Sequence, residues 1–396
     1  MKVRNVVILT IDMMIAGLVY AWSAISPDLI KSFGNIPNSK SSLVFTVCMI
    51  FFCLGGLIAG KLSSKISREN IITMGILFVS LGLVISAGVK SFNLLFITYS
   101  FMCGIGSGFI YNAGLGLVVF IDEKKIGIIS GILLMAFGLG GFVMSFLYNA
   151  LSSKLPTFRQ IFIALGIAFG LFRFLSSFFI NIKDDVKQNV IKNDHKNKAL
   201  KSFDFYIYFL WTTVLSGIGI AIIAHADKII SSQVQDDILK YLSVLSGIAA
   251  LSNGAGRVLH GFLLDKFKLK NMIFLAPIMF ITTYGILSLT SKIKVPLFVA
   301  IFILILGGAS FAGLPPMNST FMKKVFGKEE YSFNLALVNL NILISSFFPA
   351  IFGKFMDIGM DFSNIYLILM SVSVFAFLIS IVLSIRINKY INIKGE

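Results

Sequence analysis

Twelve apolar blocks, each long enough to cross a bilayer as a helix, follow one another along the 396-residue chain. A helix of about 20 residues spans the hydrocarbon layer and satisfies its own backbone hydrogen bonds there. Only 13% of the residues are charged and 57% are hydrophobic, so polar side chains are too few to cover a water-soluble globule of this length. The pattern therefore predicts an all-α membrane protein with spans at about 5–30, 41–61, 71–89, 92–121, 126–151, 158–181, 205–229, 238–263, 271–291, 295–319, 331–354 and 362–386.

The basic residues predict how these spans are oriented. If successive spans cross the membrane in opposite directions, 22 of the 34 Lys and Arg residues fall in connecting segments on one side of the membrane and ten on the other. Basic residues are enriched in cytoplasmic loops, so we expect both termini to lie in the cytoplasm. We expect the protein to be located in a cell membrane, either a bacterial inner membrane or a plasma membrane. Because the net charge of +16 is spread over short connectors, it does not predict a nucleic-acid-binding face.

The chain divides six spans plus six. The long polar segment 183–204 separates the halves, which predicts an amino-terminal bundle at 1–182, a cytoplasmic linker at 183–204 and a carboxyl-terminal bundle at 205–396. A short motif also repeats six spans apart, because Gly60-Lys-Leu-Ser-Ser-Lys65 and Gly261-Phe-Leu-Leu-Asp-Lys266 share glycine, leucine and lysine at equal spacing. Two similar halves are typical of carriers whose site lies near the bilayer midplane.

This repeated segment resembles the loop motif G-x-L-x-D-[RK] of the major facilitator superfamily. The second copy has the acid as Asp265, whereas the first has Ser64 in its place. The resemblance implies two pseudo-symmetric six-helix bundles that alternate access to one site, with gating loops at Gly60, Lys65, Gly261, Asp265 and Lys266. We expect a transporter that works as a monomer and needs no cofactor.

Further segments are similar to the oxalate/formate antiporter family, which is related to the monocarboxylate transporters. The resemblance implies a secondary carrier of small organic anions, working by antiport or proton symport. The segments are Gly17-Leu-Val-Tyr-Ala-Trp-Ser23, Gly104-Ile-Gly-Ser-Gly-Phe-Ile-Tyr111, Phe120-Ile-Asp-Glu-Lys-Lys125, Gly138-Leu-Gly-Gly141, Gly254-Ala-Gly-Arg257 and Gly307-Gly-Ala-Ser-Phe-Ala-Gly-Leu-Pro315. The glycines have a structural interpretation too, since glycine lets membrane helices approach closely.

Arg257 lies inside the eighth apolar block. A guanidinium at mid-membrane depth costs about 2.5–3.5 kcal/mol on insertion scales, so it is normally kept where it faces the protein interior and meets an anion. Its planar fork can hold a carboxylate by two hydrogen bonds. It also resembles the eighth-span arginine that binds substrate carboxylate in both related families. The alternative is a structural arginine that reaches toward the cytoplasmic end of its helix.

Two departures from those families favour a monoanion. Monocarboxylate transporters typically have an acid four residues before this arginine, where this chain has Asn253. Oxalate carriers have an eleventh-span lysine, and the nearest alignment places Leu340 there, flanked by Asn339 and Asn341. A dianion would leave one charge uncompensated in a low dielectric, so formate, lactate or pyruvate fits better than oxalate.

Three aromatic residues in apolar spans are candidates for the substrate pocket: Tyr20, Trp22 and Tyr111. Each combines an apolar ring with one polar group, which suits a pocket for a small organic acid. Core packing remains open for Tyr20 and Tyr111 and is the favoured interpretation for Trp22.

Asp12 and His260 are candidates for proton coupling. Asp12 is a carboxylate in the first span, although a position near the cytoplasmic mouth and a structural ion pair fit it equally well. His260 follows Arg257 by three residues, and this nearby cation opposes its protonation.

Other classes of function have less support. The sequence contains no metal-ligand cluster, nucleophile elbow or phosphate-binding loop, so neither an enzyme nor a metal site is expected. The expected partners are a small carboxylate, protons and the lipid bilayer. The alternatives that remain are an oxalate/formate-type dicarboxylate exchanger, an exporter of amphipathic compounds and a carrier-like sensor without net transport.

Overall fold

The regular structure of this computed structural model is helical wherever the chain is described. The chain divides into two compact units, residues 1–196 with 328–337 and residues 197–327 with 338–396, and each unit is treated by itself. Most of the predicted linker, 183–197, lies outside the described residues. The described residues are 2–34, 36, 38–122, 124–180, 198–225, 229, 232–234, 242–327 and 330–394.

Ten helical stretches within the described ranges are long and apolar enough to cross a membrane. The shorter apolar stretch Tyr331–Ser345 falls in the predicted eleventh span, and helix Leu242–Lys266 falls in the predicted eighth. The prediction of an all-α protein with twelve spans is thereby confirmed. The ten stretches are Val3–Ala21, Leu43–Leu62, Arg68–Gly88, Phe92–Ile121, Ile126–Ser152, Phe158–Ser177, Phe203–Ile222, Leu269–Thr290, Leu297–Phe326 and Phe362–Ile387.

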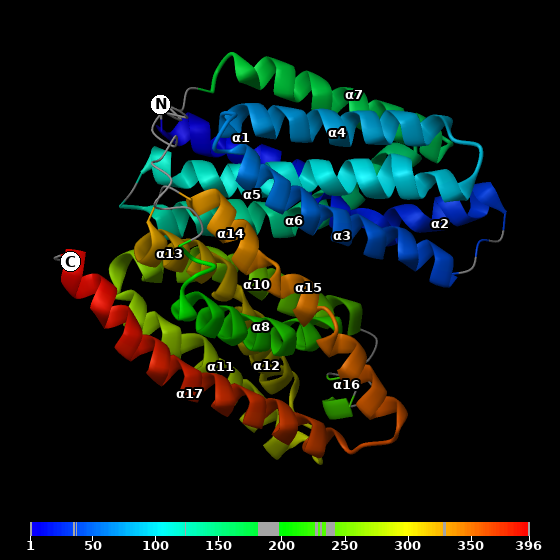
Figure 1. Cartoon of the computed structure of the whole chain (residues 1–396). Coiled ribbons are helices and arrows are strands. Elements are labelled where there is room, and N and C mark those ends of the chain that lie inside the picture. The colour runs from blue at the N-terminus through cyan, green and yellow to red at the C-terminus, as the bar shows by residue number, and fades with distance from the viewer. Residues whose placement is uncertain are drawn as a thin grey trace. The chain divides into compact units, whose positions relative to one another are not determined.

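The first unit is built around α5, whose neighbours on two sides are α3 and α4 (Figure 1). Nearly all of the span that ends with α5 is buried. The elements of this unit are α1 (Lys2–Ala16), η1 (Gly17–Ala21), α2 (Trp22–Phe33), α3 (Asn38–Leu62), α4 (Arg68–Gly88), η2 (Phe92–Leu94), η3 (Phe96–Phe101), α5 (Met102–Ile121), α6 (Ile126–Ser152) and α7 (Phe158–Ser177).

Glycines allow the helices of this unit to touch through their backbones. A Cβ atom on Gly104 would lie 2.5 Å from the carbonyl oxygen of Cys48 in α3, and one on Gly106 would lie 2.5 Å from that of Gly75 in α4. Gly17, at the start of the 3₁₀ turn η1, approaches α6 in the same way, since its Cβ would lie 2.6 Å from the Cα of Gly140. No larger side chain fits at these crossings, which supports the packing interpretation of the glycine-rich segments.

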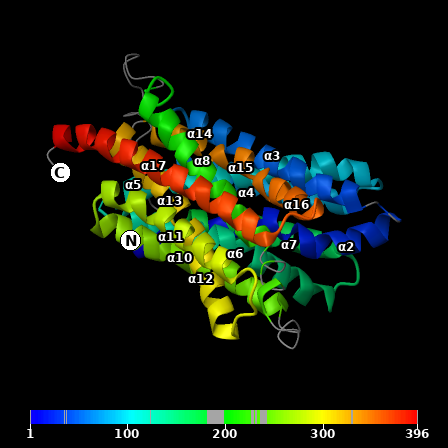
Figure 2. The ribbon, with the colours of Figure 1, turned by 90° about the horizontal axis from the view of Figure 1, so that it is seen from below.

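The second unit contains the remaining helices. The long helix α17 runs beside α11 and α8, and α8 lies beside α15 (Figures 1 and 2). The elements are α8 (Phe203–Ala224), α10 (Leu242–Lys266), α11 (Leu269–Thr290), α12 (Leu297–Ala312), α13 (Leu314–Phe326), α14 (Tyr331–Asn339), α15 (Asn341–Ser345), α16 (Phe348–Asp357) and α17 (Phe362–Lys394). The first part of α14, to Leu337, belongs to the first unit.

Two predicted spans differ from the structure. The tenth was expected at about 295–319, with a bend or an end of the helix at Pro315 and Pro316. The apolar stretch continues to Phe326 and is divided just before these prolines, where α12 ends at Ala312 and α13 begins at Leu314. The prolines stand in the first turn of α13, where a missing N–H costs no helical hydrogen bond. The eleventh span was expected to be continuous and is divided into α14, α15 and α16, with its first break at Leu340.

Candidate substrate site

Arg257 lies in α10, two turns before the carboxyl end of the helix. Its side chain is half-buried, and its Nε donates a hydrogen bond to Oδ1 of Asn253 at 3.4 Å. Because Asn253 is one helical turn earlier, both side chains share one face of α10. Asn253 is neutral, so this hydrogen bond orients the guanidinium and supplies no counter-charge.

His260 is buried on the same helix. Its Nδ1 is 2.8 Å from the carbonyl oxygen of Gly256, which can only accept, so Nδ1 is the donor. Its Nε2 is buried and has no hydrogen-bond partner in the part of the chain that the structure describes. The ring packs against the junction of α12 and α13, because a Cβ on Gly313 would lie 2.6 Å from the imidazole Cδ2. His260 thus presents a buried, unused acceptor.

The second gating motif occupies the end of α10. Gly261 is buried, whereas Asp265 and Lys266 are exposed at the helix terminus. The Lys266 ammonium lies 6.0 Å from the ring centroids of both Phe262 and Phe267. These contacts fit a helix end at a polar boundary.

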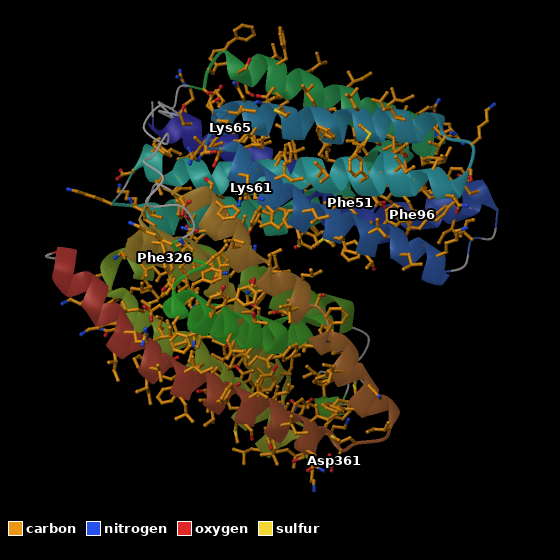
Figure 3. The ribbon with its side chains drawn as sticks, viewed as in Figure 1. Phe51, Lys61, Lys65, Phe96, Phe326 and Asp361 are labelled. Carbon is orange, nitrogen blue, oxygen red and sulfur yellow. The ribbon has the colours of Figure 1, made fainter. Side chains whose placement is uncertain are left out.

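The first gating motif occupies the end of α3. Figure 3 labels Lys61, in the last turn of α3, and Lys65, in the turn that follows, and both are exposed. Gly60 touches the start of α14, since its Cβ would lie 2.9 Å from the Cα of Phe333. Close backbone approach is therefore the role of this glycine in the structure.

Arg68 falls in the connector between the predicted second and third spans. In the structure it is the first residue of α4 and is 1% exposed. Its Nε donates to Oγ of Ser332 in α14 at 2.9 Å, and its guanidinium lies 4.9 Å from the Phe120 ring centroid. The carbonyl oxygen of Ser332 also accepts from Nδ2 of Asn112 at 3.0 Å. Sequence reasoning missed this cluster, although Arg68 lies just after the first gating motif.

Tyr20 and Tyr111 are brought together by Phe137 of α6. The Phe137 ring lies 5.3 Å from that of Tyr20 and 4.7 Å from that of Tyr111, centroid to centroid. Phe52 of α3 completes the cluster and stacks on Phe137 at 5.4 Å. Tyr111 is buried, whereas Tyr20 is 39% exposed.

Trp22 lies apart from this aromatic cluster, in a packed environment. Its indole Nε1 donates to the carbonyl oxygen of Ser41 at 3.0 Å, and its ring lies 5.0 Å from that of Tyr99. With its ring buried and its donor used, Trp22 has the surroundings of a core residue.

Asp12 forms an ion pair with Arg173 of α7. Arg173 Nη1 is 3.2 Å from Asp12 Oδ2, and both side chains are almost fully buried. Arg173 also donates from Nε to Oγ1 of Thr73 at 2.9 Å and from Nη2 to the carbonyl oxygen of Glu69 at 3.1 Å. The sequence left open whether Asp12 is paired, and the structure gives it a basic partner within the bundle.

Asn339, the last residue of α14, joins a polar cluster in the second unit. Its Oδ1 accepts from Nδ2 of Asn318 in α13 at 3.3 Å. Asn318 in turn accepts from the hydroxyls of Tyr208 and Thr212, each at 3.0 Å. The helix break at Leu340 is therefore bordered by buried hydrogen-bonding groups.

A comparison of the sequence with known protein families agrees with this architecture. A model of the Major Facilitator Superfamily matches residues 6–349. The chain belongs to this superfamily. As a member, it is a multi-pass membrane transporter and not an enzyme. The MFS-type transporter YhjX of Escherichia coli (strain K12) is 20% identical over 335 residues, which cover 83% of this chain and 82% of that protein.

Several solved structures share the superfamily fold. The fucose:proton symporter FucP of E. coli has a TM-score of 0.72 at 13% identity, covering 95% of this chain and 97% of that one. The proton:xylose symporter XylE has a TM-score of 0.72 at 16% identity, with 95% and 94% covered. A bacterial homologue of the iron transporter ferroportin, in its outward-facing state, has a TM-score of 0.71 at 14% identity, with 96% and 99% covered. At these identities the likeness shows the fold alone.

Within this fold the predicted site residues form separate groups. Tyr20 and Tyr111 share one aromatic cluster, and Asn253, Arg257 and His260 share α10. Asn339 belongs to the amide and hydroxyl cluster that includes Asn318. The residues that sequence reasoning missed are Phe137, Arg68, Asn112 and the partners of Asn339.

Proposed function

We propose that this transporter moves a small monocarboxylate of the formate, lactate or pyruvate type across a cell membrane by alternating access. Both termini are on the cytoplasmic side in this proposal, and Arg257 is the anion-binding group. The observation that carries the proposal is the half-buried guanidinium in an apolar helix, hydrogen-bonded to the neutral Asn253. A permanent charge at that depth is costly unless it serves an anion, and a carboxylate matches its fork.

The charges near the predicted site support one negative charge on the cargo. Position 253 holds an amide where monocarboxylate transporters typically have an acid, and position 340 holds leucine where oxalate carriers have lysine. A second carboxylate would have to be desolvated without a matching cation. Oxalate is therefore the weaker candidate.

His260 is the better of the two candidates for proton coupling. Asp12 is held in its ion pair with Arg173 in the first unit, whereas His260 is on the same helix as Arg257, the proposed anion-binding group. Oδ1 of Asp12 and Nε2 of His260 are both buried without a hydrogen-bond partner among the described residues. Arg257, one turn away, opposes a second positive charge on the same face of α10. A carboxylate bound to Arg257 would offset that charge, so the anion and a proton would be taken up together as a neutral pair.

A neutral, hydroxylated solute is the main competing cargo. FucP and XylE are named as proton symporters of fucose and xylose. The uncharged cluster around Asn318 and Asn339 would suit such a cargo, but the cation at Arg257 would have no function in binding it.

The test is uptake into proteoliposomes of labelled formate, lactate, pyruvate, oxalate and xylose, with and without an inward proton gradient. We expect the monocarboxylates to be taken up, with stimulation by the gradient, and oxalate and xylose to compete weakly. The gradient should lose its effect in a His260→Gln variant that still exchanges lactate for lactate. Strong xylose uptake that is indifferent to the monocarboxylates would contradict the proposal.

A further inference from the structure

Six neutral polar side chains in the second unit meet around the break between α14 and α15. Three come from one face of α8, where they recur at intervals of four residues, one comes from α13, and two flank Leu340. All but Asn339 are buried to 2% exposure or less. We call this group the asparagine cluster: Tyr208, Thr212, Ser216, Asn318, Asn339 and Asn341.

Hydrogen bonds within the cluster fix the orientation of its amides. Oδ1 of Asn318 accepts from Tyr208 and Thr212, and its Nδ2 donates to Oδ1 of Asn339. Nδ2 of Asn341 donates to Oγ1 of Thr212 at 3.1 Å and to Oγ of Ser216 at 3.0 Å. The amide of Asn318 is thus engaged at both ends, and those of Asn339 and Asn341 are each engaged at one end.

Two polar atoms of the cluster are left over, one on each side of the break. Nδ2 of Asn339 and Oδ1 of Asn341 are buried and have no hydrogen-bond partner in the part of the chain that the structure describes. A buried polar group without a partner is costly, so such pairs are normally completed by water or a ligand. One of these atoms is a donor and the other an acceptor, which are the two functions that an alcohol hydroxyl complements.

We propose that the asparagine cluster binds a hydroxyl group of the cargo, which makes the preferred substrate a hydroxylated monocarboxylate of the lactate kind. The hydroxyl accepts from Asn339 and donates to Asn341. This inference rests on the proposed function, in which Arg257 binds the carboxylate.

The helices that carry Arg257 and Asn318 are neighbours in the second unit. The helix of Arg257, α10, packs against α12 and α13, and α13 carries Asn318. Gly256, next to Arg257 in sequence, makes this approach close, since its Cβ would lie 2.6 Å from that of Ala312. A broken helix lined with polar groups is also a common place for cargo in membrane carriers.

The experiment compares lactate with propionate, which differ by one hydroxyl. Initial uptake of each acid is measured in proteoliposomes for wild type, Asn339→Leu and Thr212→Val, at equal amounts of folded protein. We expect wild type to prefer lactate by about tenfold or more, as two neutral hydrogen bonds imply. Asn339→Leu removes the free donor, and Thr212→Val removes the hydroxyl that orients Asn341 while keeping the shape of the side chain. The preference should fall toward one in both.

Ser380→Ala is the matched control. It removes the acceptor of the Trp211 indole, another buried hydrogen bond of the second unit. No residue of the cluster takes part in this bond, although the Trp211 ring lies 5.5 Å from that of Tyr208. Uptake of both acids should change by the same factor in this variant, so the preference stays at the wild-type value. A wild-type preference near one, or an unchanged preference in both cluster variants, would overturn the inference and leave the monocarboxylate proposal standing. Uptake of neither acid would overturn the proposed function, and this inference with it.

Discussion

Arg173 and Asp12 form an ion pair of 3.2 Å between Nη1 and Oδ2, with both side chains almost completely excluded from solvent. The pair joins α1 to α7, and Thr73 and Glu69 of α4 give Arg173 further acceptors. Three helices of the first unit are therefore connected through one guanidinium. Removing Arg173 would leave Asp12 buried without a counter-charge, whereas removing Asp12 would leave Arg173 with the Glu69 carboxylate, 3.8 Å from its Nη2.

Asp12→Asn should lower the free energy of unfolding by less than the about 3–5 kcal/mol that breaking a buried ion pair on one side usually costs, because the Glu69 carboxylate still lies 3.8 Å from Arg173. Thermal unfolding of the purified protein in detergent measures the loss. The double variant Asp12→Leu with Arg173→Leu should recover most of the stability, because both fully buried charges are removed and Glu69, which also pairs with Arg173, is 27% exposed. A stable Asp12→Asn protein that lost only the response to a proton gradient would instead make Asp12 the coupling group.

Gly108→Ala should destabilise the first unit. A Cβ at this position would lie 2.2 Å from the carbonyl oxygen of Phe52 and 2.7 Å from the backbone nitrogen of Gly56, both in α3. Backbone atoms can move away only if the helix moves, so the cost should be about 1–3 kcal/mol in the same unfolding measurement. Gly88→Ala is the control, because a Cβ there meets nothing within 4 Å. Equal stability of the two variants would show that α3 and α5 are not in close contact.

Thiol labelling should locate the exposed residue Lys201 in the cytoplasm and the exposed residue Lys90 outside. Each is changed to cysteine in a background that lacks the three native cysteines, and intact cells are treated with a membrane-impermeant maleimide. The distribution of basic residues predicts labelling at position 90 and none at position 201 until the cells are opened. The reverse result would invert the topology.

The sequence predicted the helical class and the number of spans well, because hydropathy over 20 residues reports directly on a lipid environment. It predicted the interruptions of the helices poorly. The break at Leu340 depends on hydrogen bonds that Asn339 and Asn341 make with α13 and α8, and such partners are distant in sequence. The local sequence pattern around Leu340 does not predict these hydrogen-bond partners.

The candidate site shows the same division. Arg257 was recognisable because a charge in an apolar run is conspicuous, and the hydrogen bond to Asn253 follows from their spacing of four residues. Arg68 had the same charge but stood at a helix start among other basic residues, so its burial against Ser332 could not be foreseen. Phe137, one of 40 phenylalanines, had nothing in its sequence context to mark it as the link between Tyr20 and Tyr111.

Initial lactate uptake by wild type, Arg257→Lys and Arg257→Gln, at equal surface expression and equal thermal stability, tests the central claim most directly. Lysine keeps the charge but loses the two-pronged donor that orients a carboxylate, so we expect uptake to fall at least about tenfold in Arg257→Lys and to be abolished in Arg257→Gln. A merely structural arginine would tolerate lysine, whose stem also reaches the interface. Near-normal uptake by Arg257→Gln would contradict the account and remove Arg257 from the substrate site.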